Sequence, residues 1–262
     1  MRFLKRVLVL LLAVFVLMGL FYSFYMRPRH VVPILMYHAV NNDTSTSLNV
    51  KPVNFARQMS FLEDAGYNVI SLKKFVEGVK AKEKFPSKTV VITFDDGFED
   101  NYLYAFPSLA KHEIPATIFV ITDYVGKREG YLTWDQVILM KNNGIDFGGH
   151  TRDNIYLPSL KSDKELWEQI AGCKEDLKKK ANYTAEFFCY PSGGFNEQVK
   201  NIVKKAGYKG ACTTNRGFDK SNTDVFELNR VKITNSDITK PFNFRAKLSG
   251  YYNVFRSLKK GD

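Results

Sequence analysis

The sequence predicts an α/β fold, in which a single membrane-spanning helix precedes a parallel β-sheet with helices on its outside. After residue 30, apolar segments of strand length alternate with segments of helical periodicity, which is typical of a parallel sheet. The run 90–94, Val-Val-Ile-Thr-Phe, consists of apolar and β-branched residues, as expected of a strand covered on both faces. About seven strands in roughly 230 residues suit a barrel. We therefore expect the sheet to curl into one.

The N-terminal segment has the features of a membrane anchor. Residues 7–26 are almost all apolar, and about 20 residues are enough to cross a bilayer. A cleaved signal peptide is the competing interpretation, because the residues before this run are basic. However, residues 21–26 contain no small-x-small cleavage pattern, and their aromatic side chains suit a membrane interface. We therefore expect residues 1–29 to be a single-pass anchor in the cell membrane, with the rest of the chain on the extracytoplasmic side; cleavage within residues 1–26 would instead give a secreted form.

Residues 30–262 are expected to form one folded domain. The 262-residue chain is 45% hydrophobic and 25% charged, which is enough apolar content for a full core. The predicted strands cover residues 33–37, 68–70, 89–94, 116–121, 145–149, 186–190, 209–213 and 228–233, and the predicted helices cover 54–66, 72–80, 100–112, 134–143, 163–181 and 196–206. Residues 41–53, rich in Asn, Ser and Thr, are expected to form a surface loop beside the functional site.

Charge and cysteine content exclude some classes of function. The formal net charge is +11, but five basic residues belong to the anchor, which leaves 33 basic against 27 acidic residues, or +6, on the domain. Aromatic and basic residues are not interleaved as on a nucleic-acid surface, so no nucleic-acid partner is expected. The three cysteines are an odd number without metal-ligand spacing, which favours buried thiols over a disulfide framework.

Polar residues that can carry chemistry follow four of the predicted strands. The strand 89–94 ends directly on two carboxylates and a glycine, for which an Asp-Gly turn with a helix cap is the alternative interpretation. Because the carboxyl ends of parallel strands meet at one rim, all four groups are expected to lie close together. The four strand ends carry Asp95-Asp96-Gly97, then His150-Thr151 with Asn154, then Tyr190-Pro191-Ser192, and His38.

These strand ends resemble the motifs of the polysaccharide deacetylases with NodB homology, carbohydrate esterase family 4. The resemblance spans about residues 32–235, and it implies a distorted (β/α)7 barrel. The opening segment 33–40 looks most like the branch that removes acetyl groups from poly-N-acetylglucosamine exopolysaccharide. The motifs that carry the resemblance are Thr93-Phe94-Asp95-Asp96-Gly97, His150-Thr151 and Tyr190-Pro191-Ser192-Gly193, supported by Trp134-Asp135 and Leu228-Asn229-Arg230-Val231.

The resemblance also implies a metal site. Asp95 would be the catalytic base, whereas Asp96 and His150 would be metal ligands. The family pattern has a second histidine where this chain has Asn154, whose amide oxygen would be the third ligand; Asp153 is the alternative. Nitrogen and oxygen ligands of these types suit Zn²⁺ best, with Co²⁺ or Ni²⁺ as other candidates.

The acid and the remaining site residues depart from the commonest family pattern. None of the four histidines follows His150, so the usual C-terminal acid is missing; elimination and the resemblance to the exopolysaccharide branch both favour His38. Cys189 stands where the family usually has an arginine that steadies the base, and we expect Arg230 to supply that cation. Further expected substrate contacts are Tyr190, Pro191 and Ser192 along the groove and Trp134, which either stacks on a sugar or belongs to the core.

The sequence therefore predicts a metal-dependent hydrolase that removes N-acetyl groups from a polymer containing N-acetylglucosamine. A peptidoglycan N-acetylglucosamine deacetylase and a polysaccharide O-acetyl esterase are alternatives within the same chemistry. A catalytically inactive glycan-binding protein is the alternative from another class, with Asn154 as the mark of a lost metal. The expected partners are the polysaccharide and the membrane, and no feature of the sequence identifies a protein partner.

Overall fold

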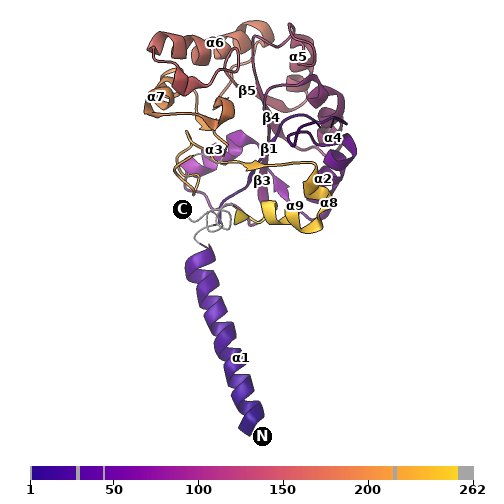
Figure 1. The fold of residues 1–262 in the computed structure, drawn as a ribbon, viewed down its shortest axis with the longest axis vertical. Helices are drawn as coiled ribbons and strands as arrows, with labels where there is room; N and C mark the ends of the chain where they lie inside the picture. The colour runs from indigo at the N-terminus through magenta and orange to yellow at the C-terminus, as the bar shows by residue number, and fades with distance from the viewer. Residues whose placement is uncertain (1, 28–29, 44, 215–216, 253–262) are drawn as a thin grey trace.

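The computed structural model describes residues 2–27, 30–43, 45–214 and 217–252. Residues 1, 28 and 29 of the predicted anchor and residues 253–262 of the predicted domain lie outside this described part. Helix α1 (Arg2–Phe21) continues into a π-helical turn, η1 (Tyr22–Met26), and projects from the folded part of the chain (Figure 1). These 25 residues are long and apolar enough to cross a membrane, and none of the tested window is buried.

Every strand of the sheet runs parallel to its neighbours. Seven strands follow one another in the order β7-β6-β5-β4-β3-β1-β8, and β2 pairs with β3 beside this path. The strands are β1 (Ile34–Tyr37), β2 (Asn68–Val69), β3 (Thr89–Phe94), β4 (Ala116–Val120), β5 (Ile145–Gly149), β6 (Phe187–Cys189), β7 (Gly210–Cys212) and β8 (Val231–Lys232).

The segment 228–232 closes the curled sheet. Leu228 bridges Cys212 at the end of β7, and β8 pairs with β1, where Val231 lies opposite Leu35. One short segment is therefore bonded to both edges of the sheet. The predicted distorted (β/α)7 barrel is confirmed, and its closing segment contains Arg230.

The helices cover the outside of the sheet (Figure 1). Each predicted helix is present, with both ends within two residues of the expected positions. The observed elements are α2 (Pro52–Asp64), α3 (Leu72–Lys80), η3 (Asn101–Ala105), α4 (Phe106–Lys111), α5 (Trp134–Asn142), η4 (Leu157–Ser159), α6 (Asp163–Ala181), η5 (Pro191–Gly193), α7 (Glu197–Lys205), α8 (Ser236–Thr239) and α9 (Pro241–Leu248).

Two features differ from the expected pattern. The single helix expected over 100–112 is a π-helical turn, η3, followed by α4, because Pro107 has no amide hydrogen to continue the ladder. Helices α8 and α9 were not predicted. Helix α9 packs Phe244 against Phe61 of α2, with ring centroids 5.8 Å apart.

Two apolar clusters form the core and leave one end of the barrel polar. Alternate residues of a strand join different clusters: Leu35 of β1 belongs to the larger cluster, with residues of the surrounding helices, whereas Ile34 belongs to the smaller one, with Phe75 of α3. The carboxyl ends of the strands extend past these two apolar clusters. Catalytic groups in α/β barrels collect at that rim.

Candidate active site

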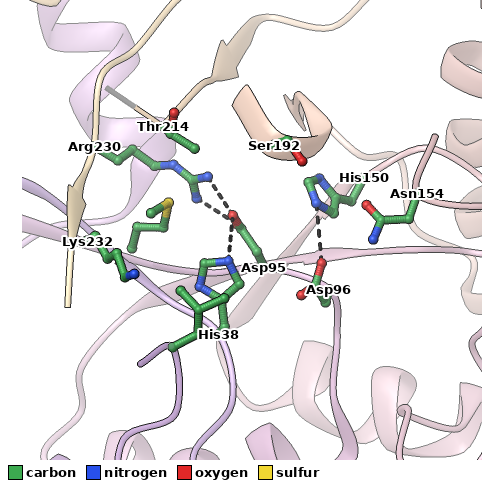
Figure 2. Close-up of a pocket in the computed structure, with 11 residues that line it drawn as sticks. His38, Asp95, Asp96, His150, Asn154, Ser192, Thr214, Arg230 and Lys232 are labelled. Atoms are coloured by element: carbon green, nitrogen blue, oxygen red, sulfur yellow. Dashed lines mark hydrogen bonds and ion pairs between the residues drawn. The ribbon is translucent and has the colours of Figure 1, made fainter. Parts of the chain in front are cut away.

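The polar strand ends meet in one pocket of about 380 Å³ (Figure 2). Seven of the ten predicted site residues line it, which confirms that the four strand ends converge. The lining residues are Met36, His38, Leu48, Asp95, Asp96, His150, Asn154, Ser192, Thr214, Arg230 and Lys232. Tyr190, Pro191 and Trp134 are not among the described residues that line it.

Asp95 and Arg230 form a buried, bidentate ion pair. Nη1 and Nη2 of Arg230 donate to the two carboxylate oxygens of Asp95, each at 2.6 Å. The guanidinium also donates through Nε to the carbonyl oxygen of Thr213 at 2.8 Å, and through Nη1 to Oγ1 of Thr93 at 3.1 Å. Burial alone would raise the pKa of Asp95, but the charge and hydrogen bonds of Arg230 outweigh it and hold that pKa well below its usual range. Asp95 is therefore ionised throughout the neutral range.

His150 presents one ring nitrogen to the pocket. Its Nδ1 lies 2.8 Å from the carbonyl oxygen of Cys189, which can only accept, so Nδ1 carries a hydrogen and donates it. The other nitrogen, Nε2, faces Oδ1 of Asp96 at 3.5 Å. Two ligands bound to one tetrahedral ion at about 2.0–2.1 Å lie about 3.3 Å apart. The His150–Asp96 separation therefore fits a shared metal ion with little movement.

The neighbouring carboxylate has a further effect on His150 when no metal is bound. Burial lowers the pKa of the imidazole. Interactions with Cys189 and with the carboxylate of Asp96 outweigh this effect and hold the pKa of His150 well above its usual value. A metal ion must displace this proton from Nε2, so metal affinity should fall as the solution becomes more acidic.

Asn154 lies beside this pair, in a turn that holds its backbone. Its φ of 65° is in the left-handed region, which asparagine tolerates, and its N–H donates to Oγ1 of Thr151 at 2.9 Å. The side-chain amide points toward His150 and Asp96 (Figure 2). It can supply the oxygen of a third ligand. Asp153, the alternative, is exposed and does not line the pocket.

A second set of potential ligands lies deeper in the barrel and fits a metal less well. One ligand atom each from Asp95, His150 and Cys189 lies within 4.8 Å of the others. Both oxygens of Asp95 already accept from Arg230, however, and burial raises the pKa of the Cys189 thiol, which keeps it protonated. Asp96, His150 and Asn154 are therefore the better candidate ligands for a metal ion.

His38 lies across the pocket at the end of β1. Its Nε2 is 3.9 Å from Oδ2 of Asp95, and its buried Nδ1 has no hydrogen-bond partner within the described ranges. Burial lowers the pKa of His38, an effect that the charges of Asp95 and Asp96 oppose only in part. The imidazole of His38 is therefore easier to deprotonate than that of a free histidine.

Asp100 and Asn101 hold the loop that carries His38, and the sequence analysis missed both. Nδ2 of Asn101 donates to the backbone carbonyl of His38 at 2.9 Å, and Oδ1 of Asp100 accepts from the N–H of Val40 at 3.0 Å. Their place just after Asp95-Asp96-Gly97 was the available signal, because the turn after a strand lies beside the neighbouring strand ends.

Other pocket residues were also missed. Lys232 follows Arg230 by two positions, so strand alternation places both side chains on the same face, and its Nζ donates to Oγ of Ser47 at 3.1 Å. Leu48 lines the pocket from the loop 41–53. The expectation that this loop walls the site is thereby confirmed.

Three predicted substrate contacts have other surroundings. Tyr190 is fully buried, donates its hydroxyl hydrogen to the carbonyl of Phe226 at 2.9 Å and stacks on Phe195. Pro191 is also buried. Trp134 begins α5, where Nζ of Lys180 lies 5.0 Å from its ring centroid. The structure therefore favours the core interpretation of the tryptophan and a supporting role for the tyrosine.

Ser192 is the member of that motif that reaches the pocket. Its φ of 53° turns the chain sharply. The N–H groups of Tyr190, Gly193 and Gly194 bond to backbone carbonyls, and Pro191 has none. The N–H of Ser192 is thus the candidate donor to a developing oxyanion.

Comparison with known proteins agrees with this geometry. The family model described as polysaccharide deacetylase matches residues 82–211. A poly-β-1,6-N-acetyl-D-glucosamine N-deacetylase of Staphylococcus aureus is 30% identical over 221 residues, which is 79% of this chain and 76% of that protein. YxkH of Bacillus subtilis, whose name places it in the same family, is 32% identical over 203 residues, or 78% of this chain and 71% of that protein.

Solved structures extend the similarity to the fold. The Streptococcus pyogenes deacetylase PplD, in complex with acetate, superposes with a TM-score of 0.75 and 30% identity, covering 83% of this chain and 97% of that one. IcaB from Ammonifex degensii superposes with a TM-score of 0.73 and 25% identity, covering 84% and 97%. The chain therefore belongs to the polysaccharide deacetylase family and is a deacetylase hydrolase.

Proposed function

We propose that this protein removes N-acetyl groups from an exopolysaccharide of the poly-N-acetylglucosamine type, with the help of a divalent metal ion. The observation that carries the proposal is that Asp96, His150 and Asn154, the proposed metal ligands, line one pocket together with Asp95 and His38, the proposed base and acid. The name and 30% identity of the S. aureus relative support this choice of polymer. Release of acetate would leave a glucosamine unit that is cationic near neutral pH.

The metal site would be formed by Asp96 Oδ1, His150 Nε2 and the amide oxygen of Asn154. A bound divalent ion polarises the amide carbonyl and makes a bound water more acidic. Zn²⁺ suits the imidazole and carboxylate ligands. The neutral amide oxygen of Asn154 is a harder ligand than imidazole, so Co²⁺ and Ni²⁺ remain candidates.

Asp95 and His38 would move the protons. Asp95 is kept ionised by Arg230, so it can accept a proton from the attacking water at any working pH. Because both its oxygens already accept from Arg230, Asp95 holds that proton weakly and can pass it on. His38, whose Nε2 lies 3.9 Å from Asp95, would protonate the leaving nitrogen. The N–H of Ser192 would stabilise the developing oxyanion.

Acetate release from three defined substrates tests the choice of polymer. We would compare β-1,6-linked N-acetylglucosamine oligomers with peptidoglycan and with an O-acetylated polysaccharide. The proposal predicts the highest kcat/KM on the β-1,6-linked oligomers. Preference for peptidoglycan or for the ester substrate would replace the proposed substrate by one of the two alternatives.

The inactive glycan-binding alternative rests on Asn154 alone. The buried Asp95–Arg230 pair and the neighbouring His38 argue against it, since binding a neutral glycan does not need an acid and a base in one pocket. This alternative would be favoured by glycan binding without any acetate release.

We also propose that α1 anchors the domain to the outer face of the cell membrane. The helix is fully exposed in its most apolar window, and basic residues precede it. Fractionation of cells decides between anchor and cleaved signal: the anchor predicts a membrane-bound protein of full length, whereas a signal peptide predicts a shortened protein in the secreted fraction.

A further inference from the structure

The chain just after α1 is bound to the domain rather than simply tethered to it. The N–H of Val31 donates to the carbonyl of Gly250 at 3.0 Å, and the ring of His30 meets the ring of Tyr251 edge-on, with centroids 5.3 Å apart. The side chain of Tyr251 also lies near that of Tyr22, at the end of the membrane helix. These contacts give the domain a defined face beside the point where α1 leaves it.

Gly250 allows this close approach. Its φ of +77° is in the left-handed region, and a Cβ at this position would lie 2.5 Å from Nε2 of His30. The absence of a side chain at position 250 therefore lets His30 and Val31 lie against this part of the chain.

Helix α9, which directly precedes this contact, presents an apolar residue and cations outward. Phe242 is 83% exposed, although Phe244 of the same helix is buried against α2. Lys240 and Arg245 are exposed beside it. In Figure 1, α8 and α9 lie at the end of the domain from which α1 leaves, and α5 and α6 lie at the opposite end.

A lysine-rich loop lies at the same end. Residues 80–88 read Lys-Ala-Lys-Glu-Lys-Phe-Pro-Ser-Lys, and Lys82, Lys84 and Lys88 are exposed. The backbone of Ser87 lies near the imidazole of His30. The loop leads into β3, which is bonded to the residues just before β1. The end of the loop therefore lies close to the residues that follow α1, and Lys84 and Lys82 precede it by a few positions.

We propose that this face, made of Phe242, Arg245 and the three lysines 82, 84 and 88, rests on the anionic surface of the bilayer that α1 spans. Lysine and arginine side chains are attracted to an anionic membrane surface, and aromatic side chains favour the interface. The domain would then keep one orientation, with α5 and α6 directed away from the lipid. The proposal rests on α1 being a membrane anchor, but not on the catalytic roles.

The test is quenching of tryptophan fluorescence by lipid. The full chain is reconstituted in nanodiscs of phosphatidylglycerol and phosphatidylcholine that contain doxyl-labelled phosphatidylcholine. The native Trp134 on α5 and Trp167 on α6 lie at the far end of the domain and give the unquenched baseline. In Phe242→Trp the added emission should fall at least about twofold, as expected for an aromatic side chain at the interface.

Paired variants test the role of charge. Lys82→Glu with Lys84→Glu, introduced into Phe242→Trp, should abolish this quenching, whereas Lys178→Glu with Lys179→Glu, on α6, should leave it unchanged. Unquenched Phe242→Trp, or equal effects of the two charge-reversal pairs, would overturn the proposal.

Phe15→Trp, within α1, separates the possible causes of failure. Quenching at position 15 without quenching at position 242 would show that the anchor is inserted but that the domain does not touch the lipid. This result would refute only the docked face. No quenching at position 15 refutes the anchor as well. Neither outcome bears on the deacetylase, because acetate release is measured separately on soluble oligomers.

Discussion

Arg230 binds both carboxylate oxygens of Asp95 across 135 positions of the sequence, with two contacts of 2.6 Å. The arginine belongs to the segment that closes the barrel between β7 and β1. Cys189, where the family usually has an arginine, lies 3.1 Å from Nη2 of the same guanidinium. The closing segment of the barrel thus supplies the cation that keeps the proposed base ionised.

Removal of this cation should damage both stability and turnover. Arg230→Met leaves Asp95 buried and unpaired, so the free energy of unfolding should fall by about 3–5 kcal/mol, as measured by urea denaturation. The double variant with Asp95→Asn should recover much of this loss, because no uncompensated charge remains. Metal content should change far less than kcat. Equal loss of metal and turnover in a folded Arg230→Met protein would contradict the assigned role.

Restoration of the family's second histidine should strengthen metal binding. Asn154→His exchanges a neutral amide oxygen for an imidazole at a backbone position that histidine tolerates. We expect Zn²⁺ affinity, measured by competition with a chromogenic chelator, to rise at least about tenfold. Asn154→Ala should lower it. If neither substitution changes the affinity, Asn154 is not a ligand.

The role of His38 as an acid predicts the direction in which activity changes with pH. Burial lowers the pKa of His38 below its ordinary value of 6.5, and only the protonated imidazole can donate. A plot of kcat/KM against pH should therefore fall as pH rises through a value below 6.5, and His38→Gln should lack this limb. A limb that rises with pH at the same position would show that His38 begins the reaction neutral, as a base.

Asp100 should act by positioning the loop that carries His38. Asp100→Ala removes the acceptor for the N–H of Val40, so kcat should fall by about tenfold to a hundredfold while metal affinity stays unchanged. The limb assigned to His38 should also shift along the pH axis, which a general loss of stability would not cause. The matched control is Glu99→Ala, whose carboxylate bonds to Gln136 on α5 instead. Equal effects of the two substitutions would argue against positioning.

Much of the fold could be predicted because the strands are short apolar runs with clear ends. The run 90–94 and its two terminal carboxylates were evident from residue type alone, and parallel strands necessarily bring such ends to one rim. Helices α8 and α9 were missed because they are short and lack a repeated apolar pattern.

The site was less predictable where it depends on tertiary contacts. Alternation along β8 could have indicated Lys232 beside Arg230, but the hydrogen bond from Asn101 to the carbonyl of His38 joins elements that are 63 residues apart. Tyr190 and Trp134 are aromatic, as sugar-binding residues often are, yet packing directs both away from the pocket. Residue type does not determine the direction of a side chain.

The most direct test combines bound metal with acetate release in the full chain and in Asp95→Asn. We expect about one divalent ion per chain in both proteins, since Asp96, His150 and Asn154 are unchanged. We also expect metal-dependent acetate release from N-acetylglucosamine oligomers by the natural chain alone. A well-folded protein that binds neither metal nor releases acetate would contradict the account and favour a glycan-binding role.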